Sequence, residues 1–192
     1  MDDYYSHHAI RVPRIPITLI GFMGSMPEIV GSSISQFTGV GFVDVNRAIE
    51  HRVGTSIARL VTEHGQDRLR ATEAECTRTA LRARPPAIIA LGDGVADDPD
   101  TLDRVTSESA LVYLRMDADD LCRRIVERRR QFPAAFYPWI PVNESVRLEQ
   151  VSVLLAERER AFEHAVLRVE AGAGRSLDQV GTEIIEHFAL TP

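Results

Sequence analysis

The sequence predicts an α/β fold in which a short parallel sheet lies between two layers of helices. Five short apolar segments, rich in β-branched residues, show no clean alternation of apolar and polar positions, which is typical of strands buried on both faces. Helical patterns separate these segments, and this alternation favours right-handed parallel crossovers. At 192 residues the chain is long enough for one compact domain with a substantial core.

The predicted elements follow a flexible N-terminal arm of residues 1–15, to which no role is assigned, and residues 16–192 are expected to form a single domain. The strands are expected at residues 16–21, 41–45, 86–91, 109–115 and 165–170. The helices are expected at residues 28–37, 46–53, 55–64, 67–83, 118–129, 144–164 and 176–189. Pro27 suits the first position of the first helix, where its missing N–H is not needed, and Gly54 separates the second helix from the third.

The segment QFPAAFYPWIPVN, residues 131–143, contains three prolines and several aromatic side chains between two predicted helices. Such a composition favours a loop over regular structure. We expect a lid at about residues 130–143.

All 22 basic residues are arginines, and the chain contains no lysine. A net charge of −6 predicts no nucleic-acid partner, and the triplet Arg128-Arg129-Arg130 is interpreted as a solvated helix end. No apolar run is long enough to span a membrane, and no signal peptide is recognised. Cys76 and Cys122 lack the spacing of metal ligands, so reduced thiols in a cytoplasmic protein are expected, with no metal site.

The first predicted strand leads into a glycine-rich turn in the segment ITLIGFMGS. A phosphate-binding loop of the type G-x-x-x-x-G-K-[ST] would continue with glycine, lysine and a hydroxyl residue, whereas Met26, Pro27 and Glu28 follow here. The lysine that contacts the terminal phosphates and the hydroxyl that holds Mg²⁺ are missing. Glu28 would repel a phosphate, because two like charges ~4 Å apart cost about 4 kcal/mol at an effective dielectric of ~20. The degenerate phosphate loop consists of Gly21, Gly24, Ser25, Met26, Pro27 and Glu28.

This loop argues against ATP-driven phosphoryl transfer and predicts that the binding of ATP and Mg²⁺ is lost, with no cofactor required. An alternative interpretation of the loop alone is an ordinary strand–turn–helix with an N-terminal cap.

Four segments taken together resemble the shikimate kinase family: ITLIGFMGS, FVDVN, RVGTSIARLVTEHGQDRLRATE and ALGDG. Their order and spacing agree with the family from about Ile17 to Phe188. The resemblance implies a P-loop kinase-like, three-layer α/β/α fold and an activity that transfers a phosphate from ATP to the 3-hydroxyl of shikimate. It further implies that Asp44 helps to hold Mg²⁺ through water and that Arg124 lies near adenine.

The same resemblance implies that Arg70 and Arg158 hold the carboxylate of shikimate. A guanidinium group suits this role, because its planar donors match a carboxylate with charge-assisted hydrogen bonds. The alternative is that both arginines pair with acids on neighbouring helix faces, with Glu73 and Glu157 close in sequence.

Two residues depart from the family pattern on this side. Asn46 replaces an acid, and its amide can bind a ring hydroxyl but cannot accept a proton as a base near neutral pH. Asp93 stands between Gly92 and Gly94, where the family has three consecutive glycines in a turn that contacts shikimate. The alternative for Asp93 is a turn aspartate bonded to its own backbone.

These residues predict a pocket for shikimate or a related cyclic hydroxy acid. Arg70, Arg158, Asn46, Gly92 and Gly94 would bind the ligand, and Asp93 and Asp44 would be the catalytic pair. The favoured hypothesis is ATP-independent acid–base chemistry of the lyase type, such as a dehydration or elimination. The alternatives are a non-catalytic sensor or regulatory partner of a shikimate-pathway enzyme and, third, an atypical shikimate kinase. A homodimer or a complex with a pathway enzyme is compatible with either of the first two.

Overall fold

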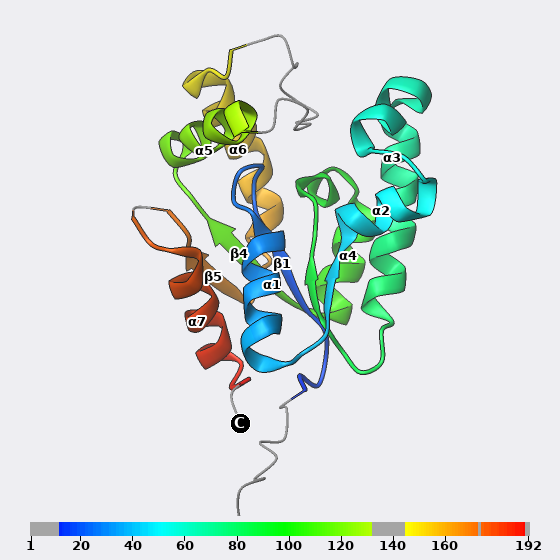
Figure 1. Ribbon diagram of the computed structural model, residues 1–192, viewed down its shortest axis with the longest axis vertical. Coiled ribbons are helices and arrows are strands. Elements are labelled where there is room, and N and C mark those ends of the chain that lie inside the picture. Colours follow the sequence, from blue (N-terminus) through cyan, green and yellow to red (C-terminus); the bar gives the residue numbers. More distant parts are fainter. Residues whose placement is uncertain (1–11, 132–144, 173, 191–192) are drawn as a thin grey trace, which may run out of the picture.

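The structure is a computed structural model, which describes residues 12–131, 145–172 and 174–190 (Figure 1). Five strands form one parallel sheet in the order β2-β3-β1-β4-β5. The predicted α/β fold with a short parallel sheet is confirmed, and each strand lies within its predicted range. The strands are β1 (Ile17–Ile20), β2 (Phe42–Asp44), β3 (Ile88–Ala90), β4 (Ala110–Arg115) and β5 (Leu167–Glu170).

The helices agree with the prediction except around one segment. The ranges predicted as 55–64 and 67–83 correspond to two helical stretches within α3, which meet at Gly65, where the backbone is not helical (φ 79°, ψ 172°). No helix was predicted between residues 92 and 108, where the structure has a short 3₁₀ helix and a full α-helix. The helices are α1 (Pro27–Thr38), α2 (Val45–Val53), α3 (Ile57–Leu81), η1 (Asp93–Asp97), α4 (Pro99–Glu108), α5 (Ala118–Gln131), α6 (Leu148–Phe162) and α7 (Leu177–His187).

The beginning of the unpredicted helix α4 has a local cause. The carboxylate of Asp98 accepts hydrogen bonds from the Thr101 backbone N–H and from the Thr101 hydroxyl, at 3.3 and 2.7 Å. Pro99 occupies the first helical position. An aspartate followed by proline is a helix-start signal, so the sequence did carry this element.

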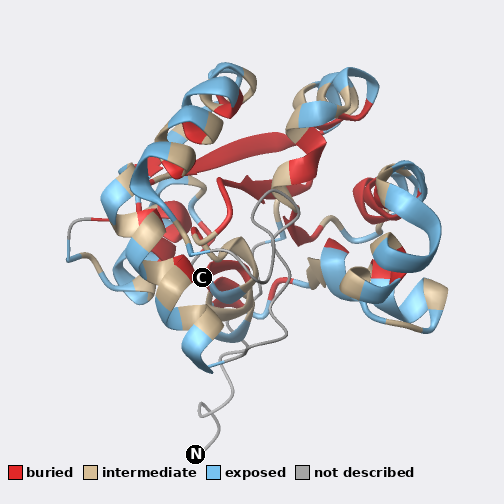
Figure 2. Ribbon diagram, turned by 90° about the horizontal axis from the view of Figure 1, so that it is seen from above, coloured by how far each residue is buried: buried red, intermediate tan, exposed pale blue. Residues whose placement is uncertain are grey.

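Two hydrophobic cores cover the two faces of the sheet, which Figure 2 shows as a buried layer between helices. Side chains of β1 alternate between them: Ile17 and Leu19 belong to one core and Ile20 to the other. Burial of both faces explains why the strands showed no polar alternation. The first core contains Val30 and Ile34 of α1 with Val180 and Ile184 of α7, and the second contains Ile49 of α2, Leu60 of α3 and Val105 of α4.

Parts of the sequence-based prediction fall on segments that are not described. Of the predicted N-terminal arm, residues 12–15 are described and form neither helix nor strand. Of the predicted lid, residues 130–131 form the end of α5, and residues 132–143 lie outside the described residues. The boundaries of the arm, the domain and the lid stay predictions.

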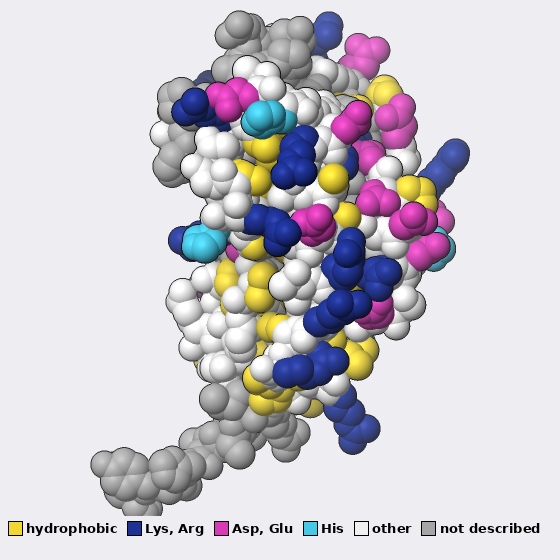
Figure 3. All heavy atoms as spheres, turned by 90° about the vertical axis from the view of Figure 1, so that its right-hand side faces the viewer, with side chains coloured by type: hydrophobic (Ala, Val, Ile, Leu, Met, Phe, Trp, Pro, Cys, Tyr) yellow, Lys and Arg dark blue, Asp and Glu magenta, His cyan; other side chains and the backbone are white. Residues whose placement is uncertain are grey.

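The described surface carries both signs of charge. Figure 3 shows the face that includes α3, where arginine side chains run down the middle with acidic side chains beside them. Among the described helices, none has the length and apolar character that crossing a membrane requires.

Candidate functional site

A cavity of about 360 Å³ lies at the carboxyl ends of the strands. It is bounded by the segments that follow β1, β2 and β3, which meet at one edge because the strands are parallel. Leu69, Arg70 and Glu73 of α3 form one side, and Arg128 of α5 reaches the end beside the glycine-rich loop. The glycine-rich loop after β1 and five of the predicted ligand-binding or catalytic residues therefore border a single space: Asn46, Arg70, Gly92, Asp93 and Gly94.

The loop after β1 turns tightly before α1 begins. The backbone N–H of Ser25 donates to the carbonyl of Phe22 at 2.9 Å, and Met26 has a left-handed backbone with φ 57°. A Cβ at Gly21 would overlap the Ser25 hydroxyl and lie 2.9 Å from the Leu114 carbonyl, so only glycine fits there. The Ser25 hydroxyl is buried and makes no hydrogen bond with any described residue.

Glu28 lies in the first turn of α1, directly beside this loop. Its Oε1 is 3.5 Å from Nη2 of Arg128, and Nη1 of Arg128 is 3.9 Å from the sulfur of Met26. Burial raises the pKa of Glu28, although backbone N–H donors and Arg128 counteract the shift. Arg128 lies in the last turn of α5 with its side chain 39% exposed, and its guanidinium contacts the glycine-rich loop in addition to solvent.

Asp44 and Asn46 follow β2 but have different surroundings. The Asp44 carboxylate accepts a hydrogen bond from the Arg47 backbone N–H at 3.2 Å and caps α2, and it is not among the groups that border the cavity. Burial raises the pKa of Asp44. Asn46 borders the cavity, with its Oδ1 close to Gly92. The structure therefore brings Asn46, but not Asp44, together with Asp93.

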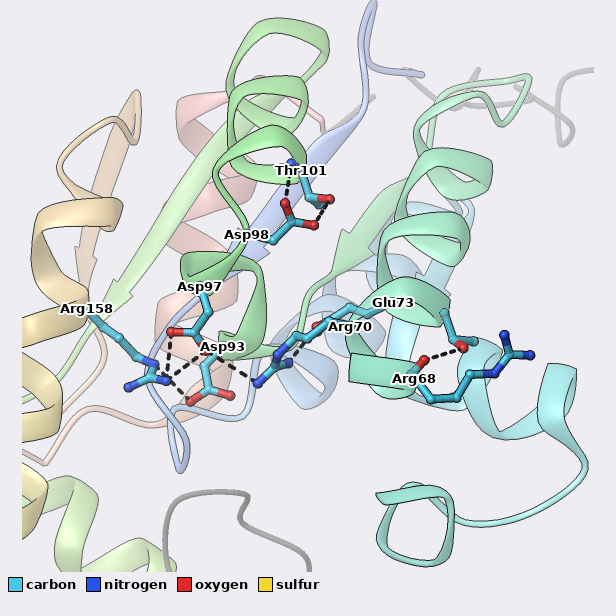
Figure 4. Close-up of polar contacts among 9 residues, drawn as sticks. Arg68, Arg70, Glu73, Asp93, Asp97, Asp98, Thr101 and Arg158 are labelled. Atoms are coloured by element: carbon cyan, nitrogen blue, oxygen red, sulfur yellow. Dashed lines mark hydrogen bonds and ion pairs between the residues drawn. The ribbon is translucent and has the colours of Figure 1, made fainter. Parts of the chain in front are cut away.

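Arg70 and Arg158 converge on a carboxylate that the sequence analysis did not identify. Asp97, at the end of η1, lies 3.4 Å from Nη2 of Arg70 and 3.0 Å from Nη2 of Arg158 (Figure 4). Arg70 also binds Glu73 through Nη1 at 2.7 Å. Both arginines thus pair with acids of the protein, which was the alternative to binding a ligand carboxylate, and Asp97 is the partner that they share.

Asp93 belongs to the same network. Its Oδ2 lies 3.8 Å from Nε of Arg158 and makes no hydrogen bond with a described residue. Burial raises the pKa values of Asp93 and Glu73, and the nearby arginines oppose this shift. The side chain of Arg158 is only 5% exposed and does not border the cavity, whereas Arg70, Glu73 and Asp93 do.

The two glycines that flank Asp93 are required by close packing. A Cβ at Gly92 would lie 2.6 Å from Oε1 of Glu73, and a Cβ at Gly94 would overlap the guanidinium of Arg70. Both glycines therefore allow the turn after β3 to lie against α3. This packing places the Asp93 carboxylate beside Arg70.

We expect Gly94→Ala to lower the melting temperature by roughly 4–8 °C, because the new methyl displaces Arg70 and leaves the buried Glu73 carboxylate without its partner, at about 2 kcal/mol. Gly41→Ala is the matched control, since its Cβ would make an ordinary 3.7 Å contact with Ala87. Thermal unfolding of the three proteins measures the difference. Equal melting temperatures for Gly94→Ala and Gly41→Ala would show that the Arg70 side chain can move away from Gly94 without loss of stability.

One further residue that the family resemblance singled out is Arg124. Nη2 of Arg124 donates to the Ala171 carbonyl at 3.1 Å, and burial lowers the pKa of Arg124. Among the described residues, no cluster of three or more His, Cys, Asp or Glu side chains could hold a metal ion. Mg²⁺ is commonly held by one or two carboxylates together with substrate phosphates, so such a cluster is not a requirement for it.

Comparison with known proteins gives a consistent result. A family model described as shikimate kinase matches residues 23–189. Relatives named shikimate kinase include one from Pelotomaculum thermopropionicum, 30% identical over 90% of this chain and 94% of its own length. Another, from Chlorobium chlorochromatii, is 30% identical over 91% of this chain and 93% of its own length.

Solved structures share the fold. Shikimate kinase from Bacteroides thetaiotaomicron superimposes with a TM-score of 0.78 at 20% identity, covering 92% of this chain and 99% of that one. Shikimate kinase from Acinetobacter baumannii in complex with shikimate superimposes with a TM-score of 0.77 at 20% identity, covering 91% and 93%. At these identities the likeness establishes the three-layer architecture.

Proposed function

The chain belongs to the shikimate kinase family, and from this membership we propose that it transfers a phosphoryl group from a nucleotide to a hydroxyl of a shikimate-like ring ligand. The observation that carries the proposal is the single cavity that joins the phosphate loop to Asn46, Arg70 and Asp93. Phosphoryl transfer requires the phosphate donor and the acceptor hydroxyl to meet in one cavity, where the protein holds both in the geometry for reaction.

Two expectations from the sequence are wrong. ATP-independent chemistry of the lyase type was favoured and ordinary kinase activity was argued against, yet the relatives that cover nearly the whole chain are kinases. The expected loss of ATP and Mg²⁺ binding conflicts with the same finding, since a kinase takes its phosphoryl group from a nucleotide bound with Mg²⁺. Both expectations treated the missing lysine as decisive, although Arg128 brings a positive charge to the loop.

At the nucleotide end, the backbone between Gly21 and Met26 would contact a phosphate, and the Arg128 guanidinium, which pairs with Glu28, would add positive charge beside it. Arg128 comes from α5 and lies beside the loop rather than within it. Asp44 acts by capping α2, which holds the neighbouring Asn46 at the cavity.

At the acceptor end, Asn46, Arg70, Gly92 and Gly94 bind the ring, and Asp93 is the proton acceptor. A ring hydroxyl oxygen forms a bond to the terminal phosphorus while the bond to the bridging oxygen of the nucleotide breaks. The hydroxyl proton passes to the Asp93 carboxylate, and burial raises the pKa of Asp93, which strengthens it as a base. Arg158, paired with Asp93, holds this carboxylate in place.

A coupled assay of ADP release with MgATP and a shikimate-type acceptor tests the proposal. Asp93→Asn should lower kcat by a factor of about 100 or more with little change in KM for ATP. Asp103→Asn, an exposed aspartate on α4, is the control. Full turnover by Asp93→Asn would show that Asp93 is not the proton acceptor. If neither the wild-type protein nor a variant released ADP in response to the acceptor, the proposed phosphoryl transfer would be wrong. The alternative, a ligand sensor or regulatory partner, stays a prediction, and it requires that no acceptor-dependent ADP release is observed.

A further inference from the structure

Three of the described arginines border the cavity, and they differ in how the protein compensates their charge. Arg70 and Arg128 each form ion pairs with carboxylates of the protein, as Figure 4 shows for Arg70. Arg47, in the first turn of α2, is exposed, and its guanidinium forms no hydrogen bond or ion pair with any residue that the structure describes. The positive charge of Arg47 is therefore the least compensated of the three.

The position of Arg47 is unfavourable for helix α2 itself. The N-terminus of a helix carries a partial positive charge, which favours an acid in the first turn and disfavours a cation. The first turn of α2 contains Arg47 and no acid, although the Asp44 carboxylate caps the helix from the preceding position. A residue that departs from a local preference in this way is expected where its charge serves a ligand.

The charged groups around Arg47 place it between the glycine-rich loop and the acceptor end. Burial raises the pKa of Asp44, and the positive charge of Arg47 counteracts this rise. Burial also raises the pKa of Glu28 beside the loop, and the charge of Asp44 adds to that rise. Asn46, which directly precedes Arg47, borders the acceptor end with its Oδ1 close to Gly92. Arg47 thus lies where the terminal phosphate of a nucleotide would meet the acceptor hydroxyl.

We infer that the guanidinium of Arg47 contacts the phosphoryl group during its transfer and supplies positive charge that the loop lacks. The inference rests on the proposed function and adds a catalytic residue to it. As the acceptor oxygen bonds to phosphorus and the bridging oxygen leaves, negative charge spreads over the equatorial oxygens of the phosphoryl group. A guanidinium matches two such oxygens with parallel N–H donors, and the chain has no lysine for this role.

Steady-state rates of ADP release with MgATP and shikimate test the inference. Arg47→Ala should lower kcat by a factor of about 100 or more with little change in KM for either substrate, because the contact is strongest in the transition state. Arg52→Ala is the matched control, since Arg52 belongs to the same helix and pairs with the exposed Glu75 outside the cavity. It should keep the wild-type kcat.

Two further measurements distinguish a catalytic role from a structural one. Guanidinium ion at millimolar concentration should raise the rate of Arg47→Ala by about tenfold or more, because it can occupy the space of the missing side chain, and should leave Arg52→Ala unchanged. Arg47→Ala should not lower the melting temperature, because Arg47 is exposed and its charge opposes the helix dipole. A structural role predicts the opposite result in both measurements.

Each other outcome has a distinct meaning. A higher KM for shikimate with an unchanged kcat would overturn the inference and assign Arg47 to an anionic group of the acceptor. Wild-type kinetics in Arg47→Ala would overturn it as well, and in both cases the proposed function stands. If the wild-type protein released no ADP in response to shikimate, the proposed function would be wrong and the role of Arg47 with it.

Discussion

Changing Met26, Pro27 and Glu28 together to glycine, lysine and serine is expected to raise kcat/KM for ATP at least 100-fold. The change removes a carboxylate from the first turn of α1 and adds an ammonium group for the terminal phosphates. Like-charge repulsion of about 4 kcal/mol at ~4 Å alone corresponds to more than two powers of ten. Arg128, which now pairs with Glu28, would become available to the nucleotide.

The backbone is suited to this exchange. Met26 already has a left-handed conformation, in which glycine is favoured over any side chain, and Pro27 occupies the first helical position, where an N–H can point at a phosphate. Initial rates of ADP release at varied ATP measure the effect. Met26→Gly alone is the control for the backbone and should change kcat/KM little. An unchanged or lower value in the triple variant would show that phosphate is bound elsewhere.

Arg158→Met is expected to cost about 3–5 kcal/mol of folding free energy at pH 7 and to lower the melting temperature by about 10 °C. Arg158 is nearly inaccessible and forms ion pairs with Asp93 and Asp97, so its removal leaves these two carboxylates with less compensating charge. The loss should be smaller at pH 5 than at pH 8. Burial raises the pKa of Asp93, so at low pH the carboxyl is protonated and no longer needs a cation.

Two further variants separate this ion-pair effect from loss of packing. Arg160→Met removes an exposed arginine from the same helix and should change the melting temperature by no more than about 1 °C. Arg158→Met combined with Asp93→Asn should recover part of the loss, because one unpaired carboxylate is removed. A double variant as unstable as the single one would assign the effect to packing of the arginine stem.

Local sequence patterns were sufficient for the sheet and most helices. The strands are buried on both faces, and that burial leaves a continuous apolar signature in each segment. Helix α4 was not predicted, although Asp98 and Pro99 mark its beginning, because it follows the glycine turn and η1 directly and has only two buried residues, Thr101 and Val105. Gly65 has a non-helical backbone and separates the two helical stretches of α3, as the two predicted ranges anticipated.

The candidate site was harder to predict for a different reason. Arg70, Arg158 and Asp93 were identified through family motifs, but Asp97 belongs to none of them. Asp97 meets Arg158 across 61 positions of sequence, and the meeting depends on the length and direction of η1. Arg128 likewise reaches Met26 across 102 positions. Pairings of this kind are set by tertiary packing, which no local pattern of residues encodes.

Glu28 couples the loop to protons. A carboxyl whose pKa is already raised by burial will have its pKa raised further when a phosphate approaches, since a neighbouring negative charge favours the protonated form. Anion binding at the loop is therefore linked to proton uptake, and the affinity for a phosphate-bearing ligand increases as the pH falls through the range in which Glu28 titrates. In a loop with lysine, a fixed cation balances the charge of the bound phosphate. In this loop, a proton that Glu28 takes up from the solvent balances part of that charge.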